Sequence, residues 1–527
     1  MSDSINYDQI KEAAAHHPKP QNLNYTYGTA GFRMKADLLD SVIFRVGILA
    51  VLRSKKLDSK TIGVMITASH NPEQDNGVKL VDPYGEMLEQ SWEGYATRLA
   101  NAQSVDDLVV IIKQIISQND IDESKPATVV YARDTRPSGP ALVDALVDGL
   151  KVLNANVIDF DVSTTPQLHY VTRCYNTQGT EDDYGVPSED GYYKKLATAF
   201  RKIVVGRPRL APFYVDAANG VGAPKIEKLA QHIGSDIIEI MLINDDVTTR
   251  GKLNYKCGAD FVKTEQGLPA GCSIKHGDRA ASLDGDADRI VFYYIDEDGT
   301  FRLLDGDKIA GLAGGFIIDL VKTAGLEGIN VGVVQTAYAN GSSTMYLKNV
   351  LASVKHLHHE AEKYDVGVYF EANGHGTVLF SPKALKTIRS SKGQTAEQEN
   401  AIEKLRALTE LINQTVGDAL SDLLLVDAIL TNRQWTLKQW DQAYTDLPNR
   451  LVKVVVENRH IFKTIDAERQ LVEPAGLQAQ IDELVSKYKN GTEDVVRVYA
   501  EAASREECDE LAYKVAGLVY DQAGGTG

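Results

Sequence analysis

Cysteine is scarce in this chain, with four among 527 residues. They lie far apart, and none belongs to a C-x-x-C pair: Cys174, Cys257, Cys272 and Cys508. The spacing therefore predicts neither a zinc cage nor a disulfide framework. Sparse cysteine in a long chain is typical of proteins from a reducing compartment, so we expect a cytoplasmic location.

Long apolar runs are lacking as well. The longest, residues 309–318, is shorter than the ~18 residues that a membrane-spanning helix needs. The N-terminal segment reads MSDSINYDQIKEAAAHH and has no apolar core of a signal peptide. We therefore expect a soluble protein with no membrane partner.

Positive charge is in deficit, with 56 Lys and Arg against 73 Asp and Glu and a net charge of −17. A protein that binds duplex nucleic acid usually presents a basic face, so no nucleic-acid partner is expected. A small anionic substrate is compatible with this balance, because a few local Arg and Lys side chains can hold a phosphate.

The chain has ample apolar material, 43% of its residues, for three or four domains. Strand-like and helix-like segments alternate through most of it, which is typical of the α/β class. The pattern predicts strands at 61–67, 128–132, 213–216, 290–295, 331–335 and 366–370. It predicts helices at 141–153, from about residue 224, across most of 395–430, and at 476–489. A strand at 494–500 and a helix that opens at Ser504, with Glu507 completing a capping box, end the chain.

Residues 67–72 read TASHNP and follow the predicted strand 61–67 directly. Open α/β sheets place their ligands at the carboxyl ends of strands, so Ser69 is positioned to be an exposed nucleophile or a phosphate carrier. The motif by itself leaves open a serine that only caps a turn.

Residues 283–289 read LDGDADR and place three carboxylates at alternate positions before a hydrophobic strand. Asp284, Asp286 and Asp288 would converge on one side of a tight loop and suit a hard cation such as Mg²⁺. Three close carboxylates repel one another without a cation, which makes a solvated acidic turn the weaker interpretation. The similar pair around Gly306, Asp305 and Asp307, is interpreted as the cap of a helix that begins near residue 308.

Two further glycine-containing loops carry polar side chains. Residues 371–377 read EANGHGT and offer donors and acceptors for sugar hydroxyls, although a simple turn fits equally well. Residues 490–493 read NGTE and, with Arg497, resemble a small anion nest; an Asn-Gly turn before a strand is the alternative. Arg33 in GTAGFR and the arginines of RDTR at 133–136 are minor candidates, with solvated arginines in a loop as the alternative.

The order of these motifs along the chain is more informative about the protein family than any single motif. GTAGFR, TASHNP, DGDADR, EANGHGT and GTED before a C-terminal strand and helix resemble the α-D-phosphohexomutase family over nearly the whole chain. Segments such as NGVKLVDPYGEML, GKLNYKCGADFVK, VVQTAYANGSST and VKHLHHEAE are similar to the eukaryotic branch that acts on N-acetylglucosamine phosphates.

The resemblance implies an α/β protein with four domains around a central cleft. Three would be related α/β domains with mixed sheets, and the fourth a smaller C-terminal α+β domain. We place them at residues 1–200, 201–302, 303–430 and 431–527. In that order they would carry the phosphoserine, metal-binding, sugar-binding and phosphate-binding loops, and we expect a monomer.

The resemblance also implies roles for individual residues. Ser69 would be the phosphoserine and, through its phosphate, a ligand of the one Mg²⁺ that the three aspartates bind. Arg33 and Arg289 would help to neutralise the phosphoryl group. Residues implied to hold the sugar are Glu371, Ala372 and Asn373. Residues implied to bind the second phosphate are Asn490, Gly491, Thr492 and Arg497.

The implied reaction interconverts N-acetylglucosamine 6-phosphate and N-acetylglucosamine 1-phosphate, a step toward UDP-N-acetylglucosamine. Phospho-Ser69 would donate its phosphoryl group, a sugar 1,6-bisphosphate would form and also serve as activator, and the other phosphate would return to Ser69. The attacking hydroxyl needs a base, and His70, Lys79 and Lys355 are all candidates.

The chain departs from the family pattern at two places. Residues 488–490 (YKN) stand where the family has Arg-x-Ser, and residues 350–353 run directly into VKH without the usual strand and Thr-Gly. These departures motivate an alternative, a catalytically weakened paralogue that binds a phosphosugar. A Mg²⁺-dependent phosphatase is a third interpretation.

Overall fold

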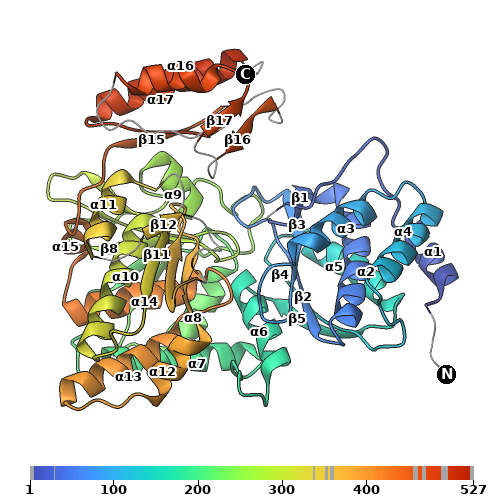
Figure 1. Ribbon diagram of the computed structural model, residues 1–527, viewed down its shortest axis with the longest axis horizontal. Helices are drawn as coiled ribbons and strands as arrows, with labels where there is room; N and C mark the ends of the chain where they lie inside the picture. Colours follow the sequence, from blue (N-terminus) through green and yellow to red (C-terminus); the bar gives the residue numbers. More distant parts are fainter. Residues whose placement is uncertain are drawn as a thin grey trace. The chain divides into compact units, whose positions relative to one another are not determined.

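A computed structural model describes residues 5–28, 30–335, 339–350, 354–356, 361, 363–454, 461–465, 470–487 and 497–522 (Figure 1). The chain forms two compact units. The first comprises Met1–Arg201, Pro208–Phe301 and Glu410–Leu424. The second comprises Lys202–Arg207, Arg302–Thr409 and Leu425–Gly527.

The first unit begins with a mixed five-stranded sheet in the order β1-β3-β2-β4-β5. Its strands are β1 (Phe32–Lys35), β2 (Thr61–Ile66), β3 (Asp75–Val81), β4 (Thr128–Arg133) and β5 (Asn156–Val162). β2, β4 and β5 run parallel, and β3 pairs antiparallel with both β1 and β2. Every residue of β2 is buried, so both faces of this strand are covered.

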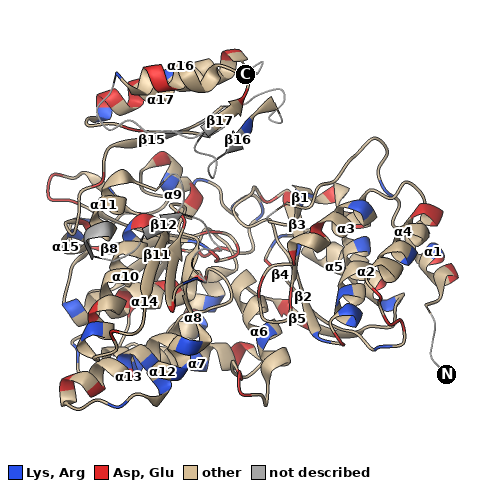
Figure 2. Ribbon diagram, in the orientation of Figure 1, with Lys and Arg blue, Asp and Glu red and all other residues tan. Residues whose placement is uncertain are grey.

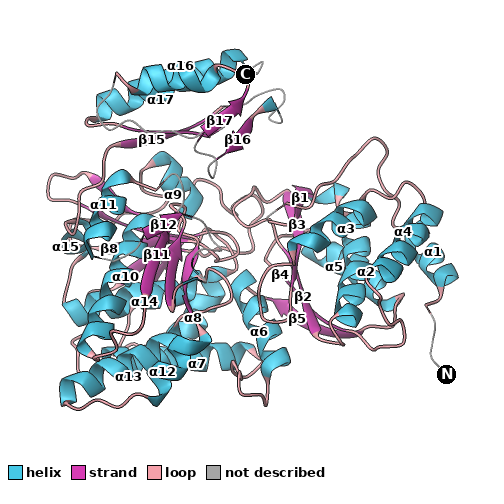
Figure 3. Cartoon of the chain, viewed as in Figure 1, coloured by secondary structure: helices cyan, strands magenta, loops and turns pink. Residues whose placement is uncertain are grey.

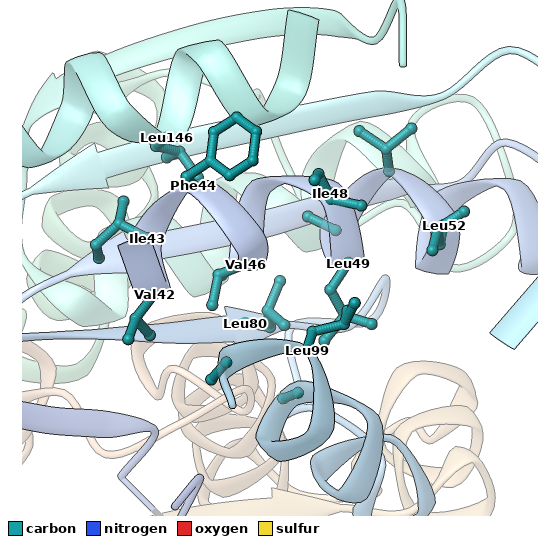
Figure 4. Packing of buried hydrophobic residues seen from close by; sticks show 14 of the residues in the cluster. Val42, Ile43, Phe44, Val46, Ile48, Leu49, Leu52, Leu80, Leu99 and Leu146 are labelled. Carbon is teal, nitrogen blue, oxygen red and sulfur yellow. The ribbon is translucent and has the colours of Figure 1, made fainter. Parts of the chain in front are cut away.

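Helices cover this sheet and supply its core. They are α1 (Tyr7–His16), η1 (Ala36–Leu38), α2 (Asp40–Lys56), α3 (Gln90–Ala100), α4 (Val105–Gln118), α5 (Gly139–Lys151) and α6 (Thr165–Thr177). Buried α2 residues pack against α5 and β3 (Figure 4). At Gly149 a Cβ would lie 2.0 Å from the carbonyl oxygen of Phe44, so only glycine allows α2 and α5 to approach this closely. The helices α1, α3 and α4 carry charges of both signs, as in the ion pair Lys11–Asp106 (Figure 2).

A second sheet of the first unit contains β6 (Phe213–Asp216), β7 (Ile240–Ile243), β8 (Arg279–Leu283) and β9 (Ile290–Ile295). β6 pairs parallel with β7 and β8, and β8 pairs antiparallel with β9. The associated helices are α7 (Glu189–Val204), α8 (Gly222–Ile233) and α9 (Ala259–Glu265).

The second unit contains a four-stranded sheet in the order β12-β11-β13-β14 (Figure 3). Its strands are β11 (Val331–Gln335), β12 (Val354–His356), β13 (Val366–Phe370) and β14 (Gly376–Phe380), preceded along the chain by β10 (Phe301–Leu304). β11 pairs parallel with β12 and β13, and β14 is antiparallel to β13. Its helices are α10 (Gly306–Thr323), α11 (Gly341–Val350), α12 (Pro382–Ser390), α13 (Ala396–Leu411) and α15 (Leu437–Asp441). The helix α14 (Ala419–Arg433) begins within the Glu410–Leu424 segment of the first unit and ends within the second.

The C-terminal segment has its own small core of apolar residues. Its elements are β15 (Asn449–Lys453), β16 (Lys463–Ile465), β17 (Gln470–Glu473), α16 (Leu477–Val485), β18 (Arg497–Glu501) and α17 (Arg505–Gln522). β15 pairs with β18 and β16 with β17, both antiparallel. The Ser504 hydroxyl accepts the amide of Glu507 at 3.3 Å, as the capping box predicts.

The α/β class and the mixed sheets expected from the sequence are confirmed. The strands predicted at 213–216, 290–295, 331–335 and 366–370 have those bounds. The helix predicted at 141–153 begins earlier, at Gly139, because Pro140 suits a first helical turn. The helix predicted at 476–489 ends at Val485, and residues 488–496 lie outside the described part. Within the part of the chain that the structure describes, none of the helices combines the length and apolar character that a membrane crossing requires.

Candidate active site

Ser69 lies in the loop that follows β2, as the sequence predicts, and it is fully buried. Its backbone φ is +51°, a left-handed conformation that is uncommon for a residue with a side chain. The Ser69 amide donates to the Thr67 hydroxyl at 3.0 Å, and its own hydroxyl donates to Asp284 Oδ2 at 2.6 Å. The candidate nucleophile and the acidic motif, 215 residues apart in sequence, are therefore in direct contact.

The three aspartates form one cluster. Oxygens of Asp284, Asp286 and Asp288 lie within 4.8 Å of one another, and all three residues are buried. Oδ1 of Asp284 accepts the amides of Asp288 and Arg289 at 3.1 and 3.2 Å, which closes the loop into a tight turn. Residues at alternate positions thus converge on one point, as the sequence predicts.

The electrostatics of this cluster fit a divalent cation. Burial, and next the charges of Asp288 and Asp286, raise the pKa of Asp284 well above its usual value. One oxygen of Asp286, Oδ1, is buried and has no hydrogen-bond partner among the described residues. Three hard oxygen donors that repel one another and offer a spare acceptor match the ligand set of Mg²⁺. The residues present therefore fit the ion that the motif predicts.

Positive side chains surround the cluster. Lys79 on β3 places its Nζ 3.7 Å from both Asp286 Oδ2 and Asp288 Oδ2. Nη1 of Arg289 donates to Nδ1 of His70 at 3.0 Å. Burial and, next, Arg289 lower the pKa of His70 to about 4, so the ring is neutral at neutral pH. Four of the candidates, Ser69, His70, Lys79 and Arg289, are therefore within reach of the same acidic loop.

Arg33 on β1 also belongs to this neighbourhood. It pairs in register with Gly77, and burial lowers its pKa against the opposing attraction of Asp286 and Asp288. Beside Asp284 and His70 lies a pocket of about 200 Å³, lined on its other sides by α9 and by the segment that leads into it. The first unit thus combines a serine, an acidic triad, cations and an open space.

The interpretation of RDTR as solvated arginines is wrong for Arg136. Its side chain is fully buried, its Nε donates to Asp134 Oδ2 at 3.0 Å, and Nη2 donates to the carbonyl oxygen of Ser69 at 2.8 Å. Arg133 is a partly exposed arginine, paired with Asp161 at 3.1 Å. Arg136 can be buried because Asp134 compensates its positive charge, so this arginine is not solvated as the alternative interpretation expected.

The EANGHGT loop lies in the second unit, between β13 and β14. The Tyr369 hydroxyl donates to Glu371 Oε1 at 2.7 Å, and Asn373 Nδ2 donates to Glu371 Oε2 at 2.9 Å. Gly374 adopts a φ of +87°, which lets its amide return to the Glu371 carbonyl at 2.8 Å. The neighbouring Ala372 is buried. The loop is therefore built to hold Glu371 and Asn373 in one orientation.

The start of α10 supports this loop. The side chain of Asp305 caps the helix by accepting the amide of Asp307 at 3.1 Å, as the sequence predicts. A Cβ at Gly306 would lie 1.7 Å from the Glu371 carbonyl oxygen. The first turn of the helix and the loop therefore touch backbone to backbone.

The remaining candidates are placed only in part. Lys355 lies in the middle of β12, where its backbone pairs with Val334. Arg497 begins β18, opposite Lys453. Asn490, Gly491 and Thr492 lie outside the described residues, as do the YKN departure at 488–490 and residues 351–353 of the other departure.

Comparison with known proteins agrees with the motifs. Two family models, for domains III and II of phosphoacetylglucosamine mutase AMG1, match residues 305–435 and 180–291. A third, for the alpha/beta/alpha domain I of phosphoglucomutase/phosphomannomutase, matches residues 50–106 and 92–180. The chain is 52% identical to the phosphoacetylglucosamine mutase of Candida albicans, over 95% of this chain and 97% of the relative. It is 50% identical to that of Homo sapiens, over 98% of both chains.

The chain belongs to the phosphoacetylglucosamine mutase family.

A solved structure of the Aspergillus fumigatus mutase, a serine-to-alanine variant in complex with glucose 1,6-bisphosphate, matches with a TM-score of 0.96 and 53% identity. The match covers 99% of this chain and 100% of that one. A second structure of the same enzyme, in complex with GlcNAc-6P and magnesium, has a TM-score of 0.93 over 98% of this chain and 99% of that one, at 53% identity. The family expectation from the sequence is confirmed, and the weakened-paralogue alternative gains no support from these relatives.

Sequence reasoning missed two residues whose side chains contact the candidate site. The Thr165 hydroxyl at the start of α6 donates to Asp286 Oδ2 at 2.6 Å, and the Asn254 side chain donates to the carbonyl oxygens of Ser69 and Asn71. Thr165 belongs to no quoted motif, and Asn254 lies in the segment GKLNYKCGADFVK, which indicated the family but predicted no role at the site. Each of the two residues lies more than 100 residues in sequence from the residue that it contacts, so only the folded chain reveals these contacts.

Proposed function

We propose that this member of the phosphoacetylglucosamine mutase family interconverts N-acetylglucosamine 6-phosphate and N-acetylglucosamine 1-phosphate through a phosphoserine and a 1,6-bisphosphate. The observation that carries the proposal is the 2.6 Å contact between the Ser69 hydroxyl and Asp284 within a buried acidic triad. A serine that only capped a turn would not need three carboxylates beside it.

Ser69 Oγ carries the phosphoryl group between substrates. In the forward direction the bond between phosphorus and Ser69 Oγ breaks, and a bond forms between phosphorus and the free sugar hydroxyl oxygen. The hydroxyl proton passes to a base, for which His70, Lys79 and Lys355 stay candidates. In the second half the other phosphate of the 1,6-bisphosphate returns to Ser69 Oγ and leaves the isomerised monophosphate.

Charge neutralisation is the main task of the surrounding residues. Asp284, Asp286 and Asp288 would hold Mg²⁺, which supplies positive charge to the phosphoryl oxygens when bound. Arg33 and Arg289 add fixed positive charge on the same unit. Both side chains are partly buried, which strengthens this effect because water screens such a charge less.

The sugar and the distal phosphate would be held by the second unit. Glu371 and Asn373, each fixed by a hydrogen bond, offer acceptors and a donor for sugar hydroxyls, with Ala372 beside them. For the distal phosphate we propose the backbone of Asn490, Gly491 and Thr492 with the Arg497 guanidinium.

For the organisation of the chain we propose four domains, with boundaries near residues 200, 302 and 430. We also propose a cytoplasmic location, which the four free cysteines support.

The test is a coupled assay that detects N-acetylglucosamine 1-phosphate formed from the 6-phosphate, with a trace of the 1,6-bisphosphate. We expect turnover by the unaltered chain, and intact mass after bisphosphate treatment should show one phosphate mapped to Ser69. The Ser69→Ala variant should lose both the phosphate and turnover while it keeps its unfolding midpoint. Steady release of inorganic phosphate without isomerised sugar would identify a phosphatase instead, and stable phosphate on another residue would reject Ser69.

A further inference from the structure

Two carbonyl oxygens of the Ser69 loop are each held from two sides. Nη2 of Arg136 donates to the carbonyls of Ser69 and Asn71 at 2.8 and 2.9 Å. Nδ2 of Asn254 donates to the same two carbonyls at 2.9 and 3.0 Å. We call these four hydrogen bonds the carbonyl clamp. Two donors on the same pair of acceptors fix the position of the loop backbone better than one.

The loop has a reason to need such a clamp. The left-handed φ of Ser69 is unfavourable for a residue with a Cβ and persists only where the surroundings over-determine it. That conformation aims the Ser69 hydroxyl at Asp284. If the carbonyls were released, the backbone could relax toward φ below zero and turn the hydroxyl away from the acidic triad.

The two halves of the clamp are anchored on different sheets of the first unit. Arg136 follows β4 and is fixed through Asp134, which also accepts the Thr67 hydroxyl at 2.8 Å. Asn254 lies in the loop after β7. Its backbone N–H donates to the carbonyl oxygen of Ala218, just after β6, at 2.9 Å. Asn254 therefore ties the serine loop of the first sheet to the sheet that carries the acidic triad.

The fit around Asn254 is close. A Cβ at Gly285, within the acidic loop, would lie 2.5 Å from the Ser69 carbonyl oxygen and 2.9 Å from Asn254 Nδ2. The amide group has two N–H bonds, and the two carbonyls use both. Aspartate has nearly the same shape but no donor, so it would set a carboxylate against two carbonyl oxygens.

We propose that Asn254 is a positioning residue for phosphoryl transfer, which acts by holding the Ser69 and Asn71 carbonyls so that the Ser69 hydroxyl faces the acidic triad. This rests on the proposed function of Ser69. The Asn254 side chain donates to two backbone carbonyls and not to the Ser69 hydroxyl, so its effect falls on the rate of transfer and not on how tightly the sugar binds.

The experiment compares Asn254→Asp with a matched control, Asn101→Asp, in the full chain. Asn101 also donates through Nδ2 to two backbone carbonyls, those of Tyr25 and Thr97, at 2.7 and 2.8 Å, and both lie away from the Ser69 loop in the sequence. Asn254→Asp should lower kcat at least about tenfold and change KM for N-acetylglucosamine 6-phosphate by less than about threefold. Asn101→Asp should keep kcat within about twofold at a similar loss of unfolding midpoint.

A second variant and a second readout complete the design. Asn254→Ala removes the donors without adding charge and serves if Asn254→Asp fails to fold. Hydrogen exchange of the peptide that spans residues 67–75 needs no activity, and it should quicken in both Asn254 variants but not in Asn101→Asp. An equal kcat for Asn254→Asp and Asn101→Asp, or unchanged exchange in the loop, overturns the proposal. If the unaltered chain shows no mutase activity, the function of Ser69 fails, while the exchange result still decides the clamp.

Discussion

The buried carboxylate of Asp286 is suited to bind a cation but destabilises the fold when no cation is bound. Its Oδ2 accepts the Thr165 hydroxyl at 2.6 Å, and its Oδ1 has no partner among the described residues, with two further carboxylates nearby. A cation bound only by the folded protein would relieve this repulsion and raise the unfolding midpoint.

We expect Mg²⁺ to raise the unfolding midpoint of the unaltered chain and to have little effect on Asp286→Asn. Asparagine can still accept the Thr165 hydroxyl but lacks the negative charge that the ion needs, so kcat should fall by orders of magnitude. Thermal unfolding with and without Mg²⁺ measures the difference, and Asp106→Asn, at an exposed position on α4, is the control. An undiminished Mg²⁺ effect in Asp286→Asn would show that the ion binds elsewhere.

A second buried carboxyl group, Asp422 on α14, has no evident role in the reaction. Neither of its oxygens has a hydrogen-bond partner among the described residues, and it is 1% exposed. Burial, and then the charge of Asp418, raise the pKa of Asp422 well above its usual value. The carboxyl therefore keeps its proton to a higher pH in the folded protein than in the unfolded chain.

This raised pKa makes the stability of the fold depend on pH. A group whose pKa is higher in the folded state contributes stability below its unfolded pKa and loses it as pH rises toward the folded value. Asp422→Asn replaces the neutral carboxyl with a neutral amide of the same size. Its stabilising effect should be small near pH 4 and grow toward pH 8, as chemical denaturation at several pH values would show. A pH-independent difference would mean that the pKa of Asp422 is the same in the folded and unfolded states.

At the scale of elements, α10 and α17 each contain a glycine, and the space around the two glycines differs. Gly306 begins α10 against the Glu371 carbonyl, where a Cβ would lie 1.7 Å from the oxygen. Gly517 lies on the exposed face of α17 with nothing within 4 Å of an added Cβ. The two positions form a matched pair in which the same substitution meets different surroundings.

Gly306→Ala should destabilise the fold by about 1–3 kcal/mol, because the loop backbone must move aside. It should also raise KM for the sugar phosphate, since the displaced loop carries Glu371 and Asn373. Gly517→Ala should stabilise by about 0.5–1 kcal/mol through helix propensity and leave KM unchanged. Denaturant titration and steady-state kinetics report both effects. An unchanged KM in Gly306→Ala would show that the loop with Glu371 and Asn373 does not bind the sugar.

At the scale of the whole molecule, the chain keeps all four thiols reduced and mostly hidden. Cys174, Cys257 and Cys508 are buried, and Cys272 is half-buried. Burial raises the pKa of the Cys174 thiol to about 11 and of the Cys257 thiol to about 12. Thiolates are the reactive form, so these groups should be inert in the folded protein.

A thiol reagent such as dithionitrobenzoate should therefore label at most one cysteine, Cys272, before unfolding and four after denaturation. A reducing agent should leave the unfolding midpoint unchanged, because the cysteines are unpaired in this fold. Rapid labelling of two or more thiols under native conditions would show that the buried cores open easily.

The sequence by itself determined the bounds of four strands, the motif order and the family. Strands such as 290–295 are short apolar runs bounded by turn residues, and that information is local, so their bounds were predicted correctly. The acidic triad was also predictable, because alternate residues of one tight loop converge without help from the rest of the chain.

Only the tertiary structure decided which distant residues meet. The family resemblance already implied that Ser69 meets the aspartates. The burial of Arg136 and the contacts of Asn254 and Thr165 with the site came only from the folded chain, because they depend on two sheets that pack together. A lone Asn or Thr has no periodicity or spacing that distinguishes a clamp from a surface turn. The free energy that selects between these states comes from long-range burial and hydrogen bonding, which a linear pattern does not record.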